Sequence, residues 1–238
     1  MKFRKQLGVG TLVLVTAVYF FVYSAVRYNL AASAAALAGQ PVTVVIDAGH
    51  GGEDGGATSV SGVSESQINL AIALRLEQVL ALCGIETKMI RTEDTAVYTQ
   101  GTTITEKKVS DLKQRVDMVN SVPNAVLVSI HQNHFSESKY DGAQVFYADT
   151  DGSKHLAQQA QSLLRQTLDP GNLREIKKAE SVYLMEQIQC TGILVECGFL
   201  SNPQEDLLLQ EDFYQIKLTC AISGALTQFL EEGSELEV

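Results

Sequence analysis

The stretch TVVIDAGHGG at residues 43–52 joins a short apolar run to a glycine-rich loop. An apolar run of about four to eight residues that ends at a turn signal is typical of a strand buried on both faces. An apolar run that ends in a polar residue also occurs in AVLVSIH at residues 125–131 and in GILVE at residues 192–196. In all three segments polar side chains stand where the apolar run ends. We therefore expect three buried strands whose carboxyl ends carry polar groups.

Helical patterns separate these predicted strands. Apolar side chains recur at helical spacing in residues 64–82, 110–120, 153–168 and 213–230, and residues 87–90 and 143–148 predict two more strands. Strands that alternate with helices favour an α/β fold. We expect a single α/β domain, with a mostly parallel central sheet and helices on both faces, preceded by an N-terminal membrane segment.

Four polar side chains gather at the predicted carboxyl edge of this sheet. His50 and His131 follow two of the buried strands, and Glu65 stands at the start of the first helix. Two histidines and one glutamate are a known catalytic zinc set that leaves a coordination position for water. Iron sites use the same set, so these residue types leave the metal open. Glu196, at the end of the third strand, can accept a proton from water and return it to a leaving amine.

Each of these residues also has an ordinary structural explanation when it is taken alone. His50 fits a turn residue, His131 fits a core histidine with satisfied hydrogen bonds, and Glu65 fits a first-turn acid that favours the helix dipole. Glu196 is harder to explain in this way, because a carboxylate that ends an apolar strand must be paired or take part in chemistry. The four residues together favour a metal site.

The first 30 residues differ from the rest of the chain. A basic cluster precedes an uncharged run from Leu7 to Val26, which as a helix would rise about 30 Å and cross a bilayer. Two interpretations stay open: an uncleaved signal-anchor at residues 1–30, or a signal peptide cleaved within the Ala-rich residues 31–38. Both place the remaining chain outside the cytoplasm, behind an Ala-rich tether at residues 31–41.

The charge balance argues against nucleic acid as a partner. The net charge of the chain is −10, and no acidic residue lies before residue 28, so the predicted exported part is more acidic still. Affinity for nucleic acid comes largely from cationic side chains that neutralise phosphates. We therefore expect no nucleic-acid partner.

The cysteine pattern favours free thiols. The chain has four cysteines, at positions 83, 190, 197 and 220, and none has CxxC spacing. An even number permits disulfides in an exported protein. Three of the four lie within apolar runs, so we expect free, buried thiols that behave as small hydrophobic side chains.

The polar motifs, taken in order, resemble those of the zinc-dependent N-acetylmuramoyl-L-alanine amidases. The matching segments are VVIDAGHGGEDGGA at 44–57, VSESQINL at 63–70, RTED at 91–94, LKQRVDMVN at 112–120, LVSIHQNH at 127–134 and LVECGFLSNPQE at 194–205. The resemblance implies that His50, Glu65 and His131 hold Zn²⁺ and that Glu196 is the catalytic residue. It also implies hydrolysis of the amide bond between N-acetylmuramic acid and L-alanine, with peptidoglycan as the substrate. Ala48 stands where the family commonly has proline, which changes the stiffness of the loop but no ligand.

A finer resemblance is to the germination-specific, spore cortex branch of this family. The N-terminal membrane segment, the bare catalytic domain and the stretch TTITEKKVSDLKQRV at 102–116 carry it. It implies a role in sporulation or germination, in the cell wall or the cortex space. We expect the catalytic domain at residues 42–231 and an acidic tail at 232–238. The need for an activator protein stays open.

Three further polar residues and two alternative hypotheses complete the expectations. Asn133, Arg115 and His134 are candidates for support of the ligands or for orientation of the substrate. A cysteine hydrolase would pair Cys197 with His131, but successive strand residues face opposite sides, so the thiol should face away from the neighbouring glutamate. A non-catalytic wall-binding domain would not need the two histidines and two glutamates together.

Overall fold

The computed structural model describes residues 41–235. The expected membrane segment at 1–30, residues 31–40 of the expected tether and the last residues of the expected acidic tail lie outside this range. Within residues 41–235 no helix has the length and apolar character that a membrane span requires.

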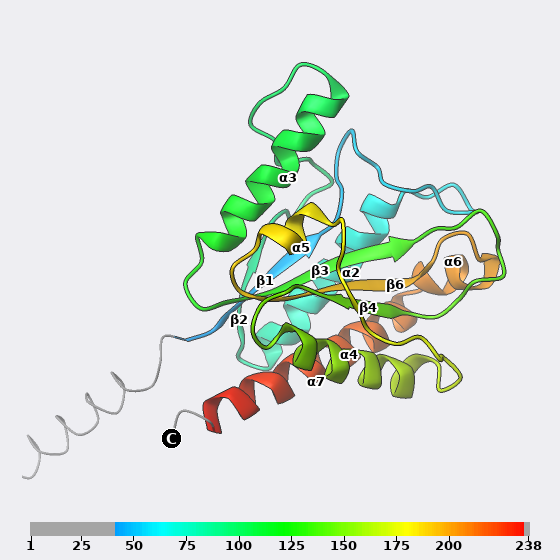
Figure 1. The fold of residues 1–238 in the computed structure, drawn as a ribbon. Coiled ribbons are helices and arrows are strands. Elements are labelled where there is room, and N and C mark those ends of the chain that lie inside the picture. Colours follow the sequence, from blue (N-terminus) through cyan, green and yellow to red (C-terminus); the bar gives the residue numbers. More distant parts are fainter. Residues whose placement is uncertain (1–40, 236–238) are drawn as a thin grey trace, which may run out of the picture. The chain divides into compact units, whose positions relative to one another are not determined.

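Six strands form one sheet in the order β2-β1-β3-β6-β4-β5 (Figure 1). The strands are β1 (Thr43–Ala48), β2 (Glu86–Met89), β3 (Ala125–Asn133), β4 (Gln144–Tyr147), β5 (Lys177–Lys178) and β6 (Thr191–Phe199). β1 pairs in parallel with β2 and β3, and β3 pairs in parallel with β6. β4 is antiparallel to β6 and parallel to β5. The expectation of a single domain with a mostly parallel sheet is confirmed, with two strands reversed at one edge.

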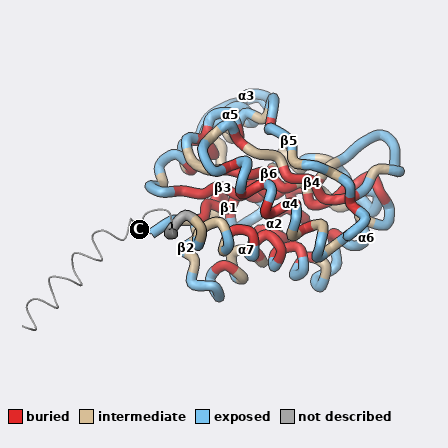
Figure 2. The backbone as a smooth tube through the Cα atoms, turned by 60° about the horizontal axis from the view of Figure 1, so that its bottom comes forward, coloured by how far each residue is buried: buried red, intermediate tan, exposed pale blue. Residues whose placement is uncertain are grey.

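Helices cover both faces of this sheet (Figures 1 and 2). The helices are α2 (Glu65–Leu82), α3 (Ile104–Asn120), α4 (Ser153–Leu168), α5 (Tyr183–Gln187), α6 (Pro203–Leu209) and α7 (Asp212–Glu235). On one face α2, α4 and α7 pack together over side chains such as Val128 and Ile193. On the other face α3 and α5 cover the alternate strand residues, including Leu127 and Leu194. Each central strand is therefore apolar on both sides, as the continuous apolar runs predict.

The structure differs from the expected elements mainly at their ends. α3 begins at Ile104 rather than residue 110, because a capping box starts it: Thr103 Oγ1 accepts from the Glu106 amide, and Glu106 accepts in return from the Thr103 amide. The apolar spacing of this helix begins only later, so periodicity alone misses its first turns. β5, α5 and α6 are short elements that the pattern did not predict, and α7 continues past residue 230 to Glu235.

β3 and β6 continue beyond their apolar runs, and this extension places the polar residues. β3 runs through His131 to Asn133, and β6 runs through Glu196 to Phe199. His131 and Glu196 are register partners, and the ladder becomes irregular directly after them. The two residues thus lie side by side within the sheet rather than in loops beyond it.

Candidate metal centre

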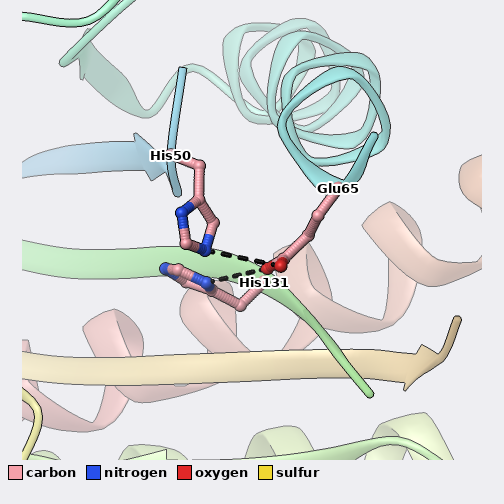
Figure 3. A group of neighbouring side chains, drawn as sticks. All are labelled: His50, Glu65 and His131. Carbon is pink, nitrogen blue, oxygen red and sulfur yellow. Dashed lines mark hydrogen bonds and ion pairs between the residues drawn. The ribbon is translucent and has the colours of Figure 1, made fainter. Parts of the chain in front are cut away.

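Three side chains from three different elements converge at the carboxyl edge of the sheet (Figure 3). His50 follows β1, Glu65 is the first residue of α2, and His131 lies on β3. One ligand atom of each lies within 4.8 Å of the other two. Glu65 Oε1 is 3.0 Å from His131 Nδ1, and Glu65 Oε2 is 3.4 Å from His50 Nε2. Ligand atoms of a tetrahedral zinc ion with bonds of about 2.1 Å lie roughly 3.4 Å apart, which is close to these two distances, and the donor types are those of a zinc site.

The backbone of the loop after β1 presents His50 in an unusual conformation. His50 has φ 62°, in the left-handed region that non-glycine residues seldom adopt. Its Nδ1 is 3.1 Å from Asp54 Oδ2, four residues along the same loop. A carboxylate on one ring nitrogen fixes the tautomer and leaves the other nitrogen to face a metal. The loop therefore directs Nε2 of His50 toward Glu65.

The carboxylate of Glu65 is held by several donors besides the two imidazoles. Oε2 accepts from the amide of Ala57 at 3.0 Å, and Oε1 accepts from the amide of Gln132 at 3.1 Å. The side chain of Asn69, one turn further along α2, donates to Oε1 at 3.3 Å and to the carbonyl of Gly49 at 3.1 Å. These contacts fix the rotamer of Glu65 before any metal binds.

His131 can approach the loop because residue 49 has no side chain. A Cβ atom at Gly49 would lie 2.2 Å from the His131 ring. The His50 and His131 rings meet edge to face, with centroids 5.1 Å apart. The glycine in the sequence DAGH is thus a steric requirement of the site.

The charges within the trio suit a cation. Burial alone would raise the pKa of Glu65, but hydrogen bonds and charge from His131 and His50 lower it well below its ordinary value. Burial alone would lower the pKa of His50, whereas Glu65 and Asp54 raise it above its ordinary value. An ionised carboxylate between two imidazoles is the form that a metal dication binds, with release of any protons on the rings.

Glu196 has the opposite environment. Its Oε2 is one of four buried side-chain nitrogen or oxygen atoms in the described part of the chain that have no hydrogen-bond partner. Burial raises the pKa of Glu196 to about 7, with His131 and His50 opposing the rise and Glu65 adding to it. A carboxyl group with such a pKa can accept or release a proton near neutral pH.

Arg115 contacts the protein rather than open space. Its guanidinium donates to the carboxylates of Asp47 and Asp111 and to the carbonyls of Ala48 and His50. Of the two roles expected for this residue, these contacts favour support of the His50 loop over orientation of a substrate.

Asn133 and His134 lie at and beyond the end of β3. Asn133 is half-buried and accepts from the Leu200 amide through its backbone carbonyl at 2.8 Å, whereas His134 is exposed. In the described residues neither side chain hydrogen-bonds to the trio. A role for either of them in substrate binding stays a prediction.

The environment of Cys197 opposes the cysteine hydrolase hypothesis. Cys197 is fully buried in the core cluster on the α2, α4 and α7 face of the sheet. Burial raises the pKa of its thiol, with the charge of Glu196 adding to the rise. A nucleophilic cysteine needs a lowered pKa and access to substrate, and Cys197 has neither.

The cysteines form no disulfide in the structure, and the expectation that they are buried is partly wrong. All four thiols are free, but Cys83 and Cys220 are exposed and Cys190 is partly exposed. Cys83 is the C-cap of α2, and Cys220 lies on α7. An apolar segment that forms a helix still has a side that faces solvent. The sequence of such a segment alone does not show which residues lie on that side.

Several residues of the site were not singled out from the sequence. Asp54 lies four positions after His50, and Asn69 lies four positions after Glu65 on α2, so a search for polar partners at that spacing would have found them. Arg91 belongs to the RTED segment that carries the family resemblance, but that resemblance gave it no role. It contacts segments far from it in the sequence, and no local signal marks those contacts.

Comparisons with known proteins identify the family of this chain. Residues 44–228 match the family model described as N-acetylmuramoyl-L-alanine amidase. The germination-specific N-acetylmuramoyl-L-alanine amidase of Bacillus subtilis is 36% identical over 197 residues, which cover 82% of this chain and 82% of the relative.

Solved structures of amidases are also similar to this chain. The CwlD amidase from Clostridioides difficile, solved in complex with the GerS lipoprotein, has a TM-score of 0.77 and 37% identity, covering 80% of this chain and 98% of that chain. The catalytic domain of the amidase CwlV from Bacillus (Paenibacillus) polymyxa has a TM-score of 0.67 and 28% identity, covering 80% and 98%. The chain therefore belongs to the N-acetylmuramoyl-L-alanine amidase family, hydrolases that cleave the amide bond between N-acetylmuramic acid and L-alanine in peptidoglycan.

Proposed function

We propose that the amidase depends on zinc, that His50, Glu65 and His131 hold the ion, and that Glu196 transfers the proton during hydrolysis. The main support is one juxtaposition: a buried carboxyl oxygen without a partner, on the strand next to His131, beside three ligand atoms that lie within 4.8 Å of one another. A buried polar atom without a partner needs an explanation, and a reacting molecule supplies one here.

The residues of the chain divide the work of the reaction. Zinc, when bound, polarises the scissile carbonyl and lowers the pKa of water to about 7. Asp54 orients His50, and Asn69 orients Glu65, so that the donor atoms converge. Glu196 accepts a proton from the attacking water at its carboxylate and donates it to the nitrogen of L-alanine as the C–N bond breaks. The nearby positive charge of a metal would favour the ionised form of Glu196, which is the form that accepts the proton.

Digestion of purified peptidoglycan, followed by mass spectrometry of the fragments, tests this function. We expect stem peptides with a free L-alanine amino group and glycan strands with intact lactyl groups. Activity should disappear after chelation and return when zinc is added. Cleavage at another bond, or an unchanged rate in chelator, would contradict the proposal.

We further propose that the substrate is the peptidoglycan of the spore cortex. The support is the match to the germination-specific amidase of Bacillus subtilis, which extends over 82% of both chains. Spores of a strain that lacks this protein should keep stem peptides on the muramic acid residues that normally lose them. Fragment analysis of purified cortex, with vegetative wall as the comparison, measures this, and an unchanged cortex would contradict the assignment.

A position outside the cytoplasm follows from the substrate, and we propose that residues 1–30 serve as a membrane anchor or a cleaved signal peptide. Mass spectrometry of the mature protein separates these two cases. We also propose a protein partner, because the similar CwlD amidase was solved in complex with a lipoprotein. Co-purification of the full-length protein from sporulating cells tests for such a partner.

A further inference from the structure

We propose that Arg91 is a positioning residue of the metal site. Its buried guanidinium braces the loop that carries His50 against the helix turn that carries Glu65. This inference rests on the proposed function, because it takes His50 and Glu65 as metal ligands.

The contacts of Arg91 join separate segments of the chain. The residue follows β2, and its side chain is only 1% exposed. Nε donates to the carbonyl of Ala48 at 2.8 Å, and Nη2 donates to the carbonyl of Gly49 at 3.1 Å. Nη2 also donates to the carbonyl of Ser66 at 2.8 Å, and Nη1 donates to the carbonyl of Glu93 at 2.9 Å. One rigid group thus links the two residues before His50 to the residue directly after Glu65.

The loop that Arg91 braces is one that needs outside support. His50, Gly51 and Gly52 have φ values of 62°, 144° and 58°. Conformations of this kind persist when the surrounding structure holds them in place. A Cβ atom at Gly51 would lie 3.1 Å from Arg91 Nε and 2.4 Å from the carbonyl oxygen of Thr95, so the glycine leaves room for the guanidinium. The absence of a side chain at Gly51 therefore allows the loop after β1 to pack against the Arg91 guanidinium.

Charge alone does not explain an arginine at this place. Burial lowers the pKa of Arg91, and the neighbouring Arg115 lowers it further, against the carboxylates of Asp94, Asp47 and Asp111. A fixed cation close to a dication site is also electrostatically unfavourable for metal binding. The contribution of Arg91 must then lie in the geometry of its hydrogen bonds. Lysine would keep the charge but lose the planar fork that reaches several carbonyls at once.

Arg165 offers a control in the same molecule, with a side chain that is 32% exposed. It lies on α4 and also braces a loop through backbone carbonyls, donating to Asn172 at 2.7 Å and to Arg174 at 2.8 Å. That loop carries none of the proposed ligands. Loss of Arg165 removes an arginine that binds backbone carbonyls without touching the metal site.

The experiment compares Arg91→Lys, Arg91→Gln and Arg165→Gln with the parent chain and with His50→Ala. The zinc dissociation constant is measured by competition with a chromophoric chelator, and thermal unfolding is recorded in EDTA. Groups that orient metal ligands typically change metal affinity about 10- to 100-fold when they are replaced. We expect both Arg91 variants to bind zinc more weakly by about that factor, and Arg165→Gln to bind zinc like the parent even if it melts earlier.

Five results would overturn the inference. Parental zinc affinity in Arg91→Lys would show that charge suffices without the fork. An equal loss of affinity in Arg165→Gln would show that the effect reports general stability. Failure of both Arg91 variants to fold even in saturating zinc, while Arg165→Gln folds, would assign Arg91 to the fold rather than to the site.

The experiment also separates failure of this inference from failure of the proposed function. A parent chain that binds no zinc would overturn both. Zinc binding that is lost in His50→Ala but kept in the Arg91 variants would overturn the inference alone.

Discussion

At the scale of single residues, two glutamates of the site have opposite surroundings. Glu65 accepts from backbone amides and from Asn69 and lies between two imidazoles, which lower its pKa. Glu196 has a buried oxygen without a partner, and burial raises its pKa to about 7. A fixed negative charge suits a ligand and a movable proton suits an acid–base group, so these surroundings support the division of roles proposed above.

Paired substitutions of these glutamates test that division. Glu196→Gln keeps the shape of the side chain but removes the base, so it should retain zinc and folding and lose at least about a hundredfold in rate. Glu65→Gln removes a charged ligand and should lose zinc itself. Metal content and rate are measured on the same preparations. If Glu196→Gln lost zinc while Glu65→Gln kept it, the two roles would have to be exchanged.

The histidines should behave alike as ligands. His50→Ala or His131→Ala leaves two protein donors, so we expect loss of both bound zinc and activity. His155→Ala is the control, because this histidine lies on α4 and pairs with Glu232 on the surface. Elemental analysis of the purified proteins measures zinc per chain. Full activity of either ligand variant in the presence of chelator would refute the site assignment.

Gly49 tests the steric requirement of the loop. In Gly49→Ala the new methyl group would lie 2.2 Å from the His131 ring, so that ring or the loop must move. We expect weaker zinc binding and a large loss of rate. Gly224→Ala on α7 is the control, because its methyl group would meet only Leu163 at 3.4 Å. Equal zinc affinity in the two variants would show that the site tolerates the displacement.

At the scale of elements, the pairing of β3 with β6 and the start of α2 assemble the site. The register sets His131 beside Glu196, and the first turn of α2 brings Glu65 to both histidines. The elements between β3 and β6 contribute to the fold. In α4, Leu156 and Leu164 are buried in the core, and the helix packs on α7. We therefore expect no self-inhibition by this helix.

A core substitution in α4 tests this expectation. Leu156→Ala should reduce the free energy of unfolding by about 2–5 kcal/mol, because it removes a fully buried side chain. The rate, measured well below the melting temperature, should not rise. Lys154→Ala at an exposed position of the same helix should change neither quantity. A higher rate in Leu156→Ala with the fold intact would identify α4 as an inhibitory element.

At the scale of the whole molecule, residues from Val42 onward form one compact unit by their contacts. A fragment that begins at Pro41 should therefore fold, bind zinc and cleave isolated peptidoglycan without the preceding segment. Its thermal unfolding should show a single cooperative transition. Calorimetry together with the fragment assay measures both properties. A fragment that is folded but inactive, beside an active full-length chain, would assign residues before 41 a direct part in the reaction.

The sequence by itself determined the three buried strands, the α/β class and the four polar residues at the sheet edge. These features are local: an apolar run, the turn that ends it, and the polar residue that follows at a fixed position. The ends of the elements were less predictable, because a capping box starts α3 outside its apolar pattern and because the β3–β6 ladder continues through His131 and Glu196.

Only the tertiary structure decided how the site is held. Arg91 and Arg115 meet the carbonyls of the His50 loop across more than 40 residues of sequence, and the exposure of Cys83 and Cys220 depends on which side of a helix is covered. The unpartnered oxygen of Glu196 is likewise a property of its packed surroundings. The physical reason is common to all three. Burial and hydrogen bonding between distant segments exist only after the chain has folded. A local pattern of residues therefore cannot predict them.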